Sequence, residues 1–523
     1  MKKLLPILLA LVLILSAAPI ASAEESPTFE FVTRYIATGD GNMNYNEGNP
    51  VTKYLEDLTG VHINFTMLPA TDDMTKLNTM IAGGELPDAL FDVMNVTQPM
   101  ILEWAEEGVI EPMEDLIAEY MPNLSAILAE RPDIATAVTA PDGHIYCFPR
   151  TDGGIHMLVN NKIYVYGPWY EAYLTAGNPE VVTTEDYANM LRYFRDNDMN
   201  GNGNAADELP VSGGKSLIQN LINPFTLYGS IGGLYLEDGV VSCPYLNEEY
   251  REGLRYIHGL WEEGLIDVEL FTQDDSQVNA LVNREAETER VVGGFSSLWD
   301  GSYVNAAIIP YDTYIAIGPL VGPEGVQQAT YSYNDVRAAS AVIFADCENK
   351  AELCRWLDYL YSYEGTILMA YGLEGVSWNW VDTPSIAGEA RSIERTASVS
   401  ELYAQNLQWD PNAPCYRTPE IKYVESAVPG GSGIDLYNSS MLYMPYADSS
   451  KAINPLLWQT SEMTEDRALY EESILTFIAE WEAAFVTGAK DLDADWEEYV
   501  GTLEAMGIED YLALMQEIVD YNA

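Results

Sequence analysis

Residues 29–68 read FEFVTRYIATGDGNMNYNEGNPVTKYLEDLTGVHINFTML. Residues 29–37 carry the aromatic and β-branched side chains of a strand, residues 51–58 have helical periodicity, and residues 62–68 form a second strand pattern. A strand, a helix and a strand in this order form a βαβ unit, in which the two strands are parallel. We therefore predict an α/β protein whose sheets are flanked by helices.

Charge and composition narrow the function classes. The 523 residues include 25 Lys and Arg against 81 Asp and Glu, a formal net charge of −56. So negative a field argues against nucleic acid or an anionic membrane as a partner. With 48% apolar residues the chain has enough material for sizeable cores, and its length suggests roughly two to four domains.

The first residues predict export. Lys2 and Lys3 precede an apolar run over residues 4–15, and small residues follow it up to Ala23. This is the pattern of a secretory signal peptide, residues 1–23, which we expect to be cleaved after Ala23. The apolar run is too short to span a membrane. No cysteine follows it, so no lipid anchor is expected, which leaves retention at the cell surface unexplained.

Several segments are similar to sequence motifs of a known protein family. They are KLNTMIAGGELPD at 76–88, PDGHIY at 141–146, LRYIHGLWEEGLID at 254–267, WLDYLYSYEG at 356–365, YGLEGVSW at 371–378 and DWEEYV at 495–500. In this order they resemble the extracellular solute-binding proteins of ABC transporters. The likeness is to the oligosaccharide-binding branch of family 1, which is similar to alginate-binding and maltose-binding proteins.

The resemblance implies a two-lobe fold of the periplasmic-binding-protein type (type II). Each lobe would be a sheet flanked by helices, with a ligand cleft between the lobes. We expect residues 24–152 and 330–375 in the amino-terminal lobe, and residues 153–329 and 376–523 in the carboxy-terminal lobe. The implied function is that of a secreted, monomeric binding protein without catalysis, which captures an oligosaccharide and delivers it to the permease subunits of an ABC importer.

A sugar site needs aromatic platforms for apolar C–H faces and polar side chains for hydroxyls. Trp299 follows a short predicted strand, in a position where the family places a stacking tryptophan. Trp378 and Trp380 alternate with Asn379, so in an extended segment both rings point to one side. For each of the three tryptophans, a role in a core or a hinge is the alternative. The weaker candidates on loop ends facing the cleft are Asp40, Asn44, Glu85 and Arg337.

The polar run DNDMNGNGNAADE, residues 196–208, predicts a calcium loop. Oxygen side chains recur at every second residue across a glycine-bearing turn, which is the spacing that wraps a loop around Ca²⁺. The expected ligands are Asp198, Asn200, Asn202, Asn204, Asp207 and Glu208. Counting from Asp196 or from Asp198 gives two registers that share most of these ligands. A solvated loop is the alternative.

An exported glycan hydrolase or lyase is the alternative from a different class. Paired carboxylates would arise in any chain this acidic, so they carry no argument without geometry. The chain has no HExxH, GxSxG or Walker pattern. Its five cysteines have no spacing that indicates a disulfide framework or a metal site.

Overall fold

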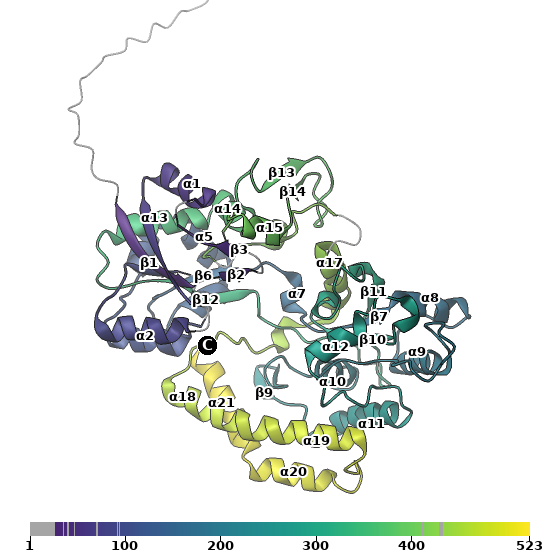
Figure 1. The fold of residues 1–523 in the computed structure, drawn as a ribbon. Helices are drawn as coiled ribbons and strands as arrows, with labels where there is room; N and C mark the ends of the chain where they lie inside the picture. Colours follow the sequence, from purple (N-terminus) through teal and green to yellow (C-terminus); the bar gives the residue numbers. More distant parts are fainter. Residues whose placement is uncertain are drawn as a thin grey trace, which may run out of the picture.

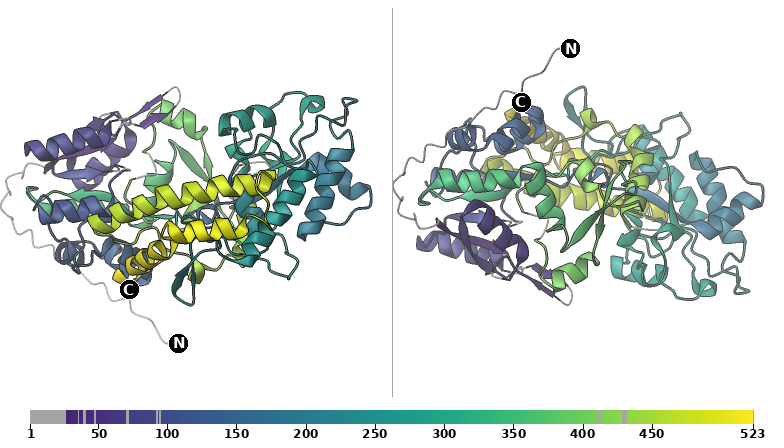
Figure 2. Two further views of the ribbon diagram at one scale, coloured as in Figure 1. Left: turned by 90° about the horizontal axis from the view of Figure 1, so that it is seen from below. Right: turned by 90° about the horizontal axis from the view of Figure 1, so that it is seen from above.

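A computed structural model describes residues 27–34, 36–38, 41–46, 48–69, 72–91, 93, 95–409, 413–427 and 432–522. Figure 1 shows two α/β lobes, with the purple to dark blue segments in one lobe on the left and the lighter blue and teal segments in the other on the right. The yellow carboxy-terminal helices run beneath both lobes, as the view from below in Figure 2 also shows. The predicted signal peptide and Asp40 lie outside the described residues.

The amino-terminal lobe is built on a five-stranded sheet in the order β4-β1-β5-β12-β6. Its strands are β1 (Thr28–Arg34), β4 (His62–Leu68), β5 (Ala89–Phe91), β6 (Phe148–Thr151) and β12 (Val336–Ile343). β1 is parallel to β4 and β5, while β12 is antiparallel to β5 and β6. The strand ends at Arg34, Leu68 and Phe91 therefore lie on one side of the sheet, which we call the carboxyl edge. β6 ends and β12 begins at this edge, so the first crossing leaves the amino-terminal lobe there and the second crossing returns there.

The predicted βαβ unit is confirmed, and its helix has clear local causes. The helix α1 (Pro50–Thr59) joins β1 and β4, which pair in register from Thr28 and His62 to Arg34 and Leu68. The Asn49 side chain accepts a hydrogen bond from the Val51 amide at 2.9 Å and caps the helix start. Gly60, with φ of 70°, ends it. Between β1 and α1 lies a small antiparallel pair of β2 (Ile36–Thr38) and β3 (Gly41–Met43).

The other helices of this lobe cover both faces of the sheet. They are α2 (Asp73–Gly83), α3 (Gln98–Glu106), α4 (Glu114–Tyr120), α5 (Pro122–Glu130), α6 (Pro132–Val138), α13 (Lys350–Leu360) and α14 (Tyr363–Tyr371). One face buries an aromatic group that includes Phe31, Phe91, Trp356 and Trp409. The other face buries Leu77 and Trp104, among others. Both faces of the sheet are therefore buried under helices, as is usual for sheets with parallel strands.

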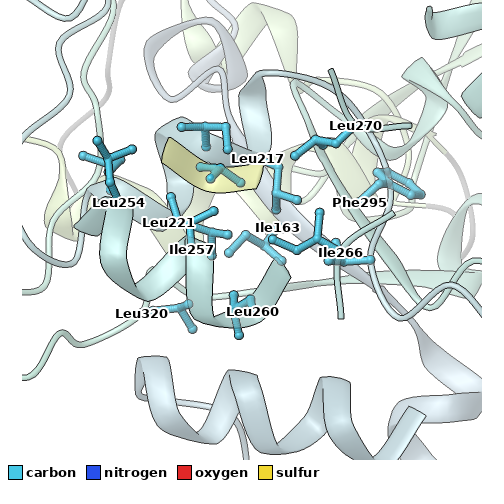
Figure 3. Packing of buried hydrophobic residues seen from close by; sticks show 14 of the residues in the cluster. Ile163, Leu217, Leu221, Leu254, Ile257, Leu260, Ile266, Leu270, Phe295 and Leu320 are labelled. Carbon is cyan, nitrogen blue, oxygen red and sulfur yellow. The ribbon is translucent and has the colours of Figure 1, made fainter. Parts of the chain in front are cut away.

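The carboxy-terminal lobe has a smaller antiparallel sheet in the order β10-β7-β11. Its elements are α7 (Ile155–Leu158), β7 (Lys162–Tyr166), α8 (Gly167–Thr175), α9 (Thr184–Asp196), α10 (Ser216–Ile222), β8 (Tyr235–Glu237), β9 (Val240–Ser242), α11 (Glu248–Glu262), α12 (Asp275–Val282), η1 (Glu287–Glu289), β10 (Gly294–Ser297), η2 (Asp300–Ser302), η3 (Tyr311–Thr313) and β11 (Tyr314–Ile317). Figure 3 shows Leu217 and Leu221 packing against Leu254, Ile257 and Leu260 in its core.

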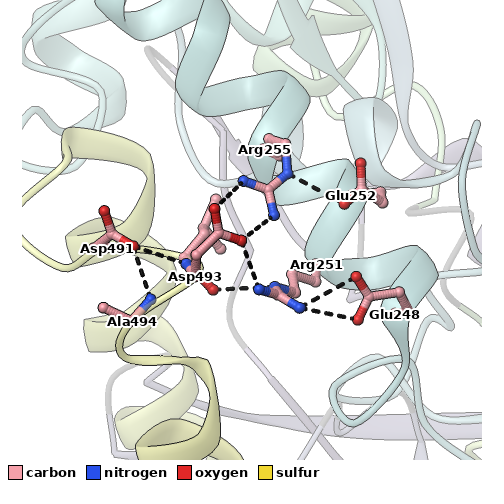
Figure 4. A network of polar contacts seen from close by, with 8 residues as sticks. Glu248, Arg251, Glu252, Arg255, Asp491, Asp493 and Ala494 are labelled. Atoms are coloured by element: carbon pink, nitrogen blue, oxygen red, sulfur yellow. Dashed lines mark hydrogen bonds and ion pairs between the residues drawn. The ribbon is translucent and has the colours of Figure 1, made fainter.

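The last helices complete the carboxy-terminal lobe. They are α18 (Ser461–Tyr470), a π-helical turn η6 (Glu471–Leu475), α19 (Thr476–Thr487), α20 (Trp496–Ala505) and α21 (Ile508–Tyr521). Ile478, Phe485 and Tyr499 join the same core as Leu254. On the surface, Asp493 accepts hydrogen bonds from Arg251 and Arg255 of α11 at 2.6 and 2.8 Å (Figure 4). No helix in the described part of the chain is long and apolar enough to cross a membrane.

The third crossing differs from the expected division. This region holds β13 (Trp378–Val381), β14 (Ser392–Arg395), α15 (Val399–Ala404), α16 (Pro419–Lys422), α17 (Ser432–Tyr443), η4 (Met444–Tyr446) and η5 (Ser449–Lys451). We expected all residues after 376 in the carboxy-terminal lobe, but Trp409 and Cys415 pack in the core of the amino-terminal sheet. Trp378 and Ile421 share a satellite core with Tyr371 of α14. The crossing therefore follows residue 427, and α17 is the first element beyond it, packed against β7 and β11.

Candidate ligand-binding site

Trp299 forms an aromatic platform at the end of β10. Its ring is half-buried and lies 5.4 Å from the ring of Tyr311, with 35° between the two planes. A Cβ atom on Gly301 would lie 2.5 Å from the Trp299 indole, so the ring position requires glycine there. The segment 299–311 thus brings together two aromatic rings, of which the sequence indicated only Trp299.

Two buried ionisable side chains, Lys162 and Asp300, contact the backbone next to Trp299 or within two residues of it. Lys162, the first residue of β7, is fully buried, and its Nζ donates to the Leu298 carbonyl at 2.7 Å. Asp300 is 1% exposed, and its Oδ1 accepts a hydrogen bond from the Gly301 amide at 2.9 Å. Burial, with Asp435 and Asp312 nearby, raises the pKa of Asp300 to about 7. No local pattern indicated a role for this lysine, because a lysine is almost never fully buried without a partner.

Trp378 and Trp380 lie in β13 of the amino-terminal lobe, paired with β14. Their rings are 5.4 Å apart, and Asn379 is exposed, so the alternation of sides occurs as expected. Trp378, however, is 4% exposed and donates its indole N–H to the Gly372 carbonyl, which makes it a core residue. Trp380 is half-buried, and the Arg391 guanidinium lies 4.6 Å from its ring centre. In this conformation, only Trp380 of the pair presents a ring at the surface.

The polar candidates lie in different places. Asn44 follows β3, its amide donates to Asn406 Oδ1 at 2.9 Å, and its own Oδ1 accepts from the Asn46 amide. Its side chain therefore shapes the loop beyond the carboxyl edge. Arg337, near the start of β12, lines a cavity of about 430 Å³ between α3, β12 and α18.

Glu85 is the candidate that the topology removes from this group. It lies between α2 and β5, at the end of the sheet where β5 begins. Because β5 runs parallel to β1, that end is opposite the carboxyl edge. The prediction was wrong in geometry because α2 carries the chain back along the whole length of the sheet.

A buried ionic group at the first crossing is absent from the sequence expectations. Asp152 lies 3.0 Å from Lys422 Nζ and 3.8 Å from Arg417 Nη1. Burial alone would raise the pKa of Asp152, but Lys422 and Arg417 hold it well below its usual value. The Thr151 amide also donates to the Cys415 carbonyl at 3.1 Å. Residues 415–422 therefore pack beside the first crossing and hold it through both backbone and side-chain contacts. The partners are about 270 residues apart, which explains why no local pattern indicated them.

The loop 196–208 has the shape of a cation loop. Asp198 accepts from the amides of Asn202 and Gly203, and Glu208 Oε1 accepts from the Met199 amide at 2.9 Å. Asn202 donates to Asp207 Oδ2 at 2.7 Å. Asp207 Oδ1 and Glu208 Oε2 are buried and have no hydrogen-bond partner in the described part of the chain.

The chemistry of these donors fits Ca²⁺. Two buried carboxylate oxygens without donors are costly unless a cation supplies the missing contact. Burial, with Asp207 nearby, also raises the pKa of Glu208. Gly201 and Gly203 have φ of 70° and 88°, a conformation that favours glycine and lets the turn tighten. The side chains of Asn200 and Asn204 take part in the internal bonds of the loop. Within the described residues, no group of three or more His, Cys, Asp and Glu side chains is already gathered as a metal cage.

Three comparisons show which known proteins the chain is similar to. Residues 51–191 match the family model for bacterial extracellular solute-binding proteins. The fructooligosaccharide ABC transporter substrate-binding protein FusA of Streptococcus pneumoniae serotype 4 is 28% identical over 511 residues, which are 95% of this chain and 91% of FusA. A solved structure of S. pneumoniae FusA in complex with kestose is 26% identical with a TM-score of 0.68, and the match covers 94% of this chain and 99% of that one. This chain is similar to extracellular solute-binding proteins along nearly its whole length.

The two-lobe fold is also shared with a solved structure of lower sequence identity. An extracellular solute-binding protein from Bifidobacterium longum subsp. infantis is 18% identical with a TM-score of 0.77, over 96% of this chain and 99% of that one. Among the curated relatives, FusA is an ABC transporter substrate-binding protein, and YtcQ of Bacillus subtilis, 22% identical over 68% of this chain and 67% of YtcQ, is a polygalacturonan/rhamnogalacturonan-binding protein. The binding-protein interpretation therefore holds over the alternative of a glycan hydrolase or lyase.

Proposed function

We propose that this solute-binding protein captures an oligosaccharide between its two lobes and delivers it to the permease subunits of an ABC importer. The observation that carries the proposal is the similarity to FusA, a fructooligosaccharide-binding protein, along nearly the whole length of both chains. Fructooligosaccharides are therefore the first ligands to test. A signal peptide cleaved after Ala23 would export the protein, which we propose acts as a monomer.

The platform of Trp299 and Tyr311 supports a sugar ligand. Sugar rings present apolar C–H faces that pack on aromatic rings, and their hydroxyls need polar partners. Trp380, Asn44 and Arg337 are proposed to act from the amino-terminal lobe, with Trp378 supporting Trp380 from the core. Since the chain carries 81 acidic against 25 basic residues, an uncharged oligosaccharide fits better than a polyanionic one.

Calorimetric titration with kestose, compared with a panel of neutral and uronate oligosaccharides, tests the proposal. We expect saturable binding of a neutral member, and Trp299→Ala should weaken it by about 1–3 kcal/mol through loss of stacked aromatic area. Tyr363→Ala is the matched control, because Tyr363 is an aromatic residue 54% exposed on the amino-terminal lobe outside the platform. Binding at parental affinity by Trp299→Ala would contradict the role of Trp299. Recovery of the ligand in hydrolysed form would favour the enzyme alternative.

We further propose that the loop 196–208 holds one structural Ca²⁺. The residues that would hold it are Asp198, Asn200, Asn202, Asp207 and Glu208, together with the backbone carbonyl of Asn204. The two buried, unpartnered carboxylate oxygens support this assignment. One solved structure of FusA is of an EF-hand mutant, so that relative carries an EF-hand. The ion would neutralise clustered carboxylates and order a loop that contains two glycines.

A further inference from the structure

Two side-chain hydrogen bonds hold the backbone next to Trp299. Lys162 Nζ donates to the carbonyl of Leu298, the residue before Trp299, at 2.7 Å. The Ser297 hydroxyl donates to the carbonyl of Trp299 itself, also at 2.7 Å. Lys162 and Ser297 are register partners in β7 and β10, so both hydrogen bonds come from the sheet of this lobe. Lys162 is 0% exposed, although lysine is almost never fully buried without a partner.

Asp300 supplies the opposite charge. It directly follows Trp299, it is 1% exposed, and its Oδ2 is buried without a hydrogen-bond partner among the described residues. Its negative charge favours the protonated form of Lys162, while burial lowers the pKa of Lys162 to about 7. Burial raises the pKa of Asp300 to about 7 as well. Both groups therefore change charge near neutrality, and their titrations are coupled.

The other ionisable groups around the pair are mostly acidic. Asp312 from η3 and Asp435 from α17 face Asp300 and oppose its ionisation. Burial raises the pKa of Tyr164 of β7 and of Tyr311 of η3, and the charge of Asp300 adds to both shifts. Burial lowers the pKa of His156 of α7, and the charge of Lys162 lowers it further. Lys162 is thus the group named here that stabilises a negative Asp300.

We propose that Lys162 and Asp300 are positioning residues that fix Trp299 for ligand binding, and that their charge pair makes binding strongest near neutral pH. The affinity part of this proposal rests on the proposed function, whereas the positioning of Trp299 does not. In acid, Asp300 gains a proton and leaves the charge of Lys162 buried alone. In alkali, Lys162 loses its proton and leaves Asp300 alone. Either change loosens the segment that carries Trp299, so affinity falls on both sides of neutrality.

A ligand-free measurement tests the positioning directly. The full chain is labelled with 5-fluorotryptophan, and the Trp299 resonance is identified in the ¹⁹F spectrum by its loss in Trp299→Phe. Between about pH 5.5 and 8.5 this resonance should shift in the parent protein on both sides of neutrality. Lys162→Met and Asp300→Asn should each remove one limb, while Lys53→Met, a surface control whose side chain is 74% exposed, should leave both limbs. A Trp299 resonance that does not respond to pH in the parent would overturn the proposal, even if the variants fail to fold.

Titration with kestose tests the consequence for binding. The parent should show a bell-shaped dependence of affinity on pH, and Lys162→Met should bind at least about tenfold more weakly at neutral pH, because a charged hydrogen bond to Leu298 is lost. Parental affinity in Lys162→Met, together with parental pH dependence, would overturn the proposal. Absence of kestose binding at every pH, with a titrating Trp299 resonance, would count against a fructan ligand and support the positioning role.

Discussion

Replacement of Asp152 by asparagine should destabilise the protein at the first crossing between the lobes. The Asp152 carboxylate lies between Lys422 and Arg417, and the side chains of the three are 24%, 20% and 8% exposed. Removing one partner of a buried ion pair costs about 3–5 kcal/mol, since the remaining charge stays buried. Because part of Asp152 still reaches solvent, we expect the lower end of this range, about 3 kcal/mol.

Urea unfolding of the parent and Asp152→Asn at several pH values measures this difference. The two cations keep the pKa of Asp152 in the folded state below its ordinary value of 3.8, so the stabilisation is complete above that value. It is lost as the pH falls further. The gap between the parent and the variant should therefore be constant at neutral pH and shrink in acid. Asp382→Asn is the control, because Asp382 is 98% exposed and 3.9 Å from Arg391. Equal unfolding midpoints for the parent and Asp152→Asn at pH 7 would refute the reasoning.

Three further outcomes are expected. Gly301→Ala should weaken ligand binding by about tenfold, because its Cβ would lie 2.5 Å from the Trp299 ring, whereas Gly259→Ala, with nothing within 4 Å, should bind as the parent does. Chelation of calcium should lower the melting temperature with little change in sugar affinity, and Asp207→Ala with Glu208→Ala should remove that effect; identical melting curves with and without chelator would leave the solvated loop. Ligand should close the lobes, so small-angle scattering should give a smaller radius of gyration with saturating kestose, and an unchanged radius would count against hinge closure.

Local patterns predicted the elements well where one short stretch contains all the causes. The βαβ unit of β1, α1 and β4 follows from strand alternation, the cap at Asn49 and the stop at Gly60, which are all local. Residues 111–128 have helical periodicity throughout, but they form two helices, α4 and α5, with Pro122 at the first turn of the second. Proline disfavours the α conformation in the residue before it and so breaks the run.

The binding site depended on contacts that no local pattern encodes. Trp299 was indicated by its place after a strand, but its support by Lys162 depends on the pairing of β7 with β10, which are more than 100 residues apart. Trp378 looks like a site residue in the sequence, and only the packing of Ile421 and Tyr371 around it shows a core role. The predicted position of the third crossing was wrong for the same reason, because the packing of Trp409 against Phe91 cannot be inferred from either segment alone.

The most direct test of the binding-site account is a crystal structure of the full chain grown with kestose, or with whichever panel member binds most tightly. We predict a sugar ring stacked on Trp299 at about 4 Å, with further contacts from the amino-terminal lobe and the lobes drawn together. A sugar bound elsewhere, for example only in the cavity lined by Arg337, with Trp299 free of contact, would contradict the account.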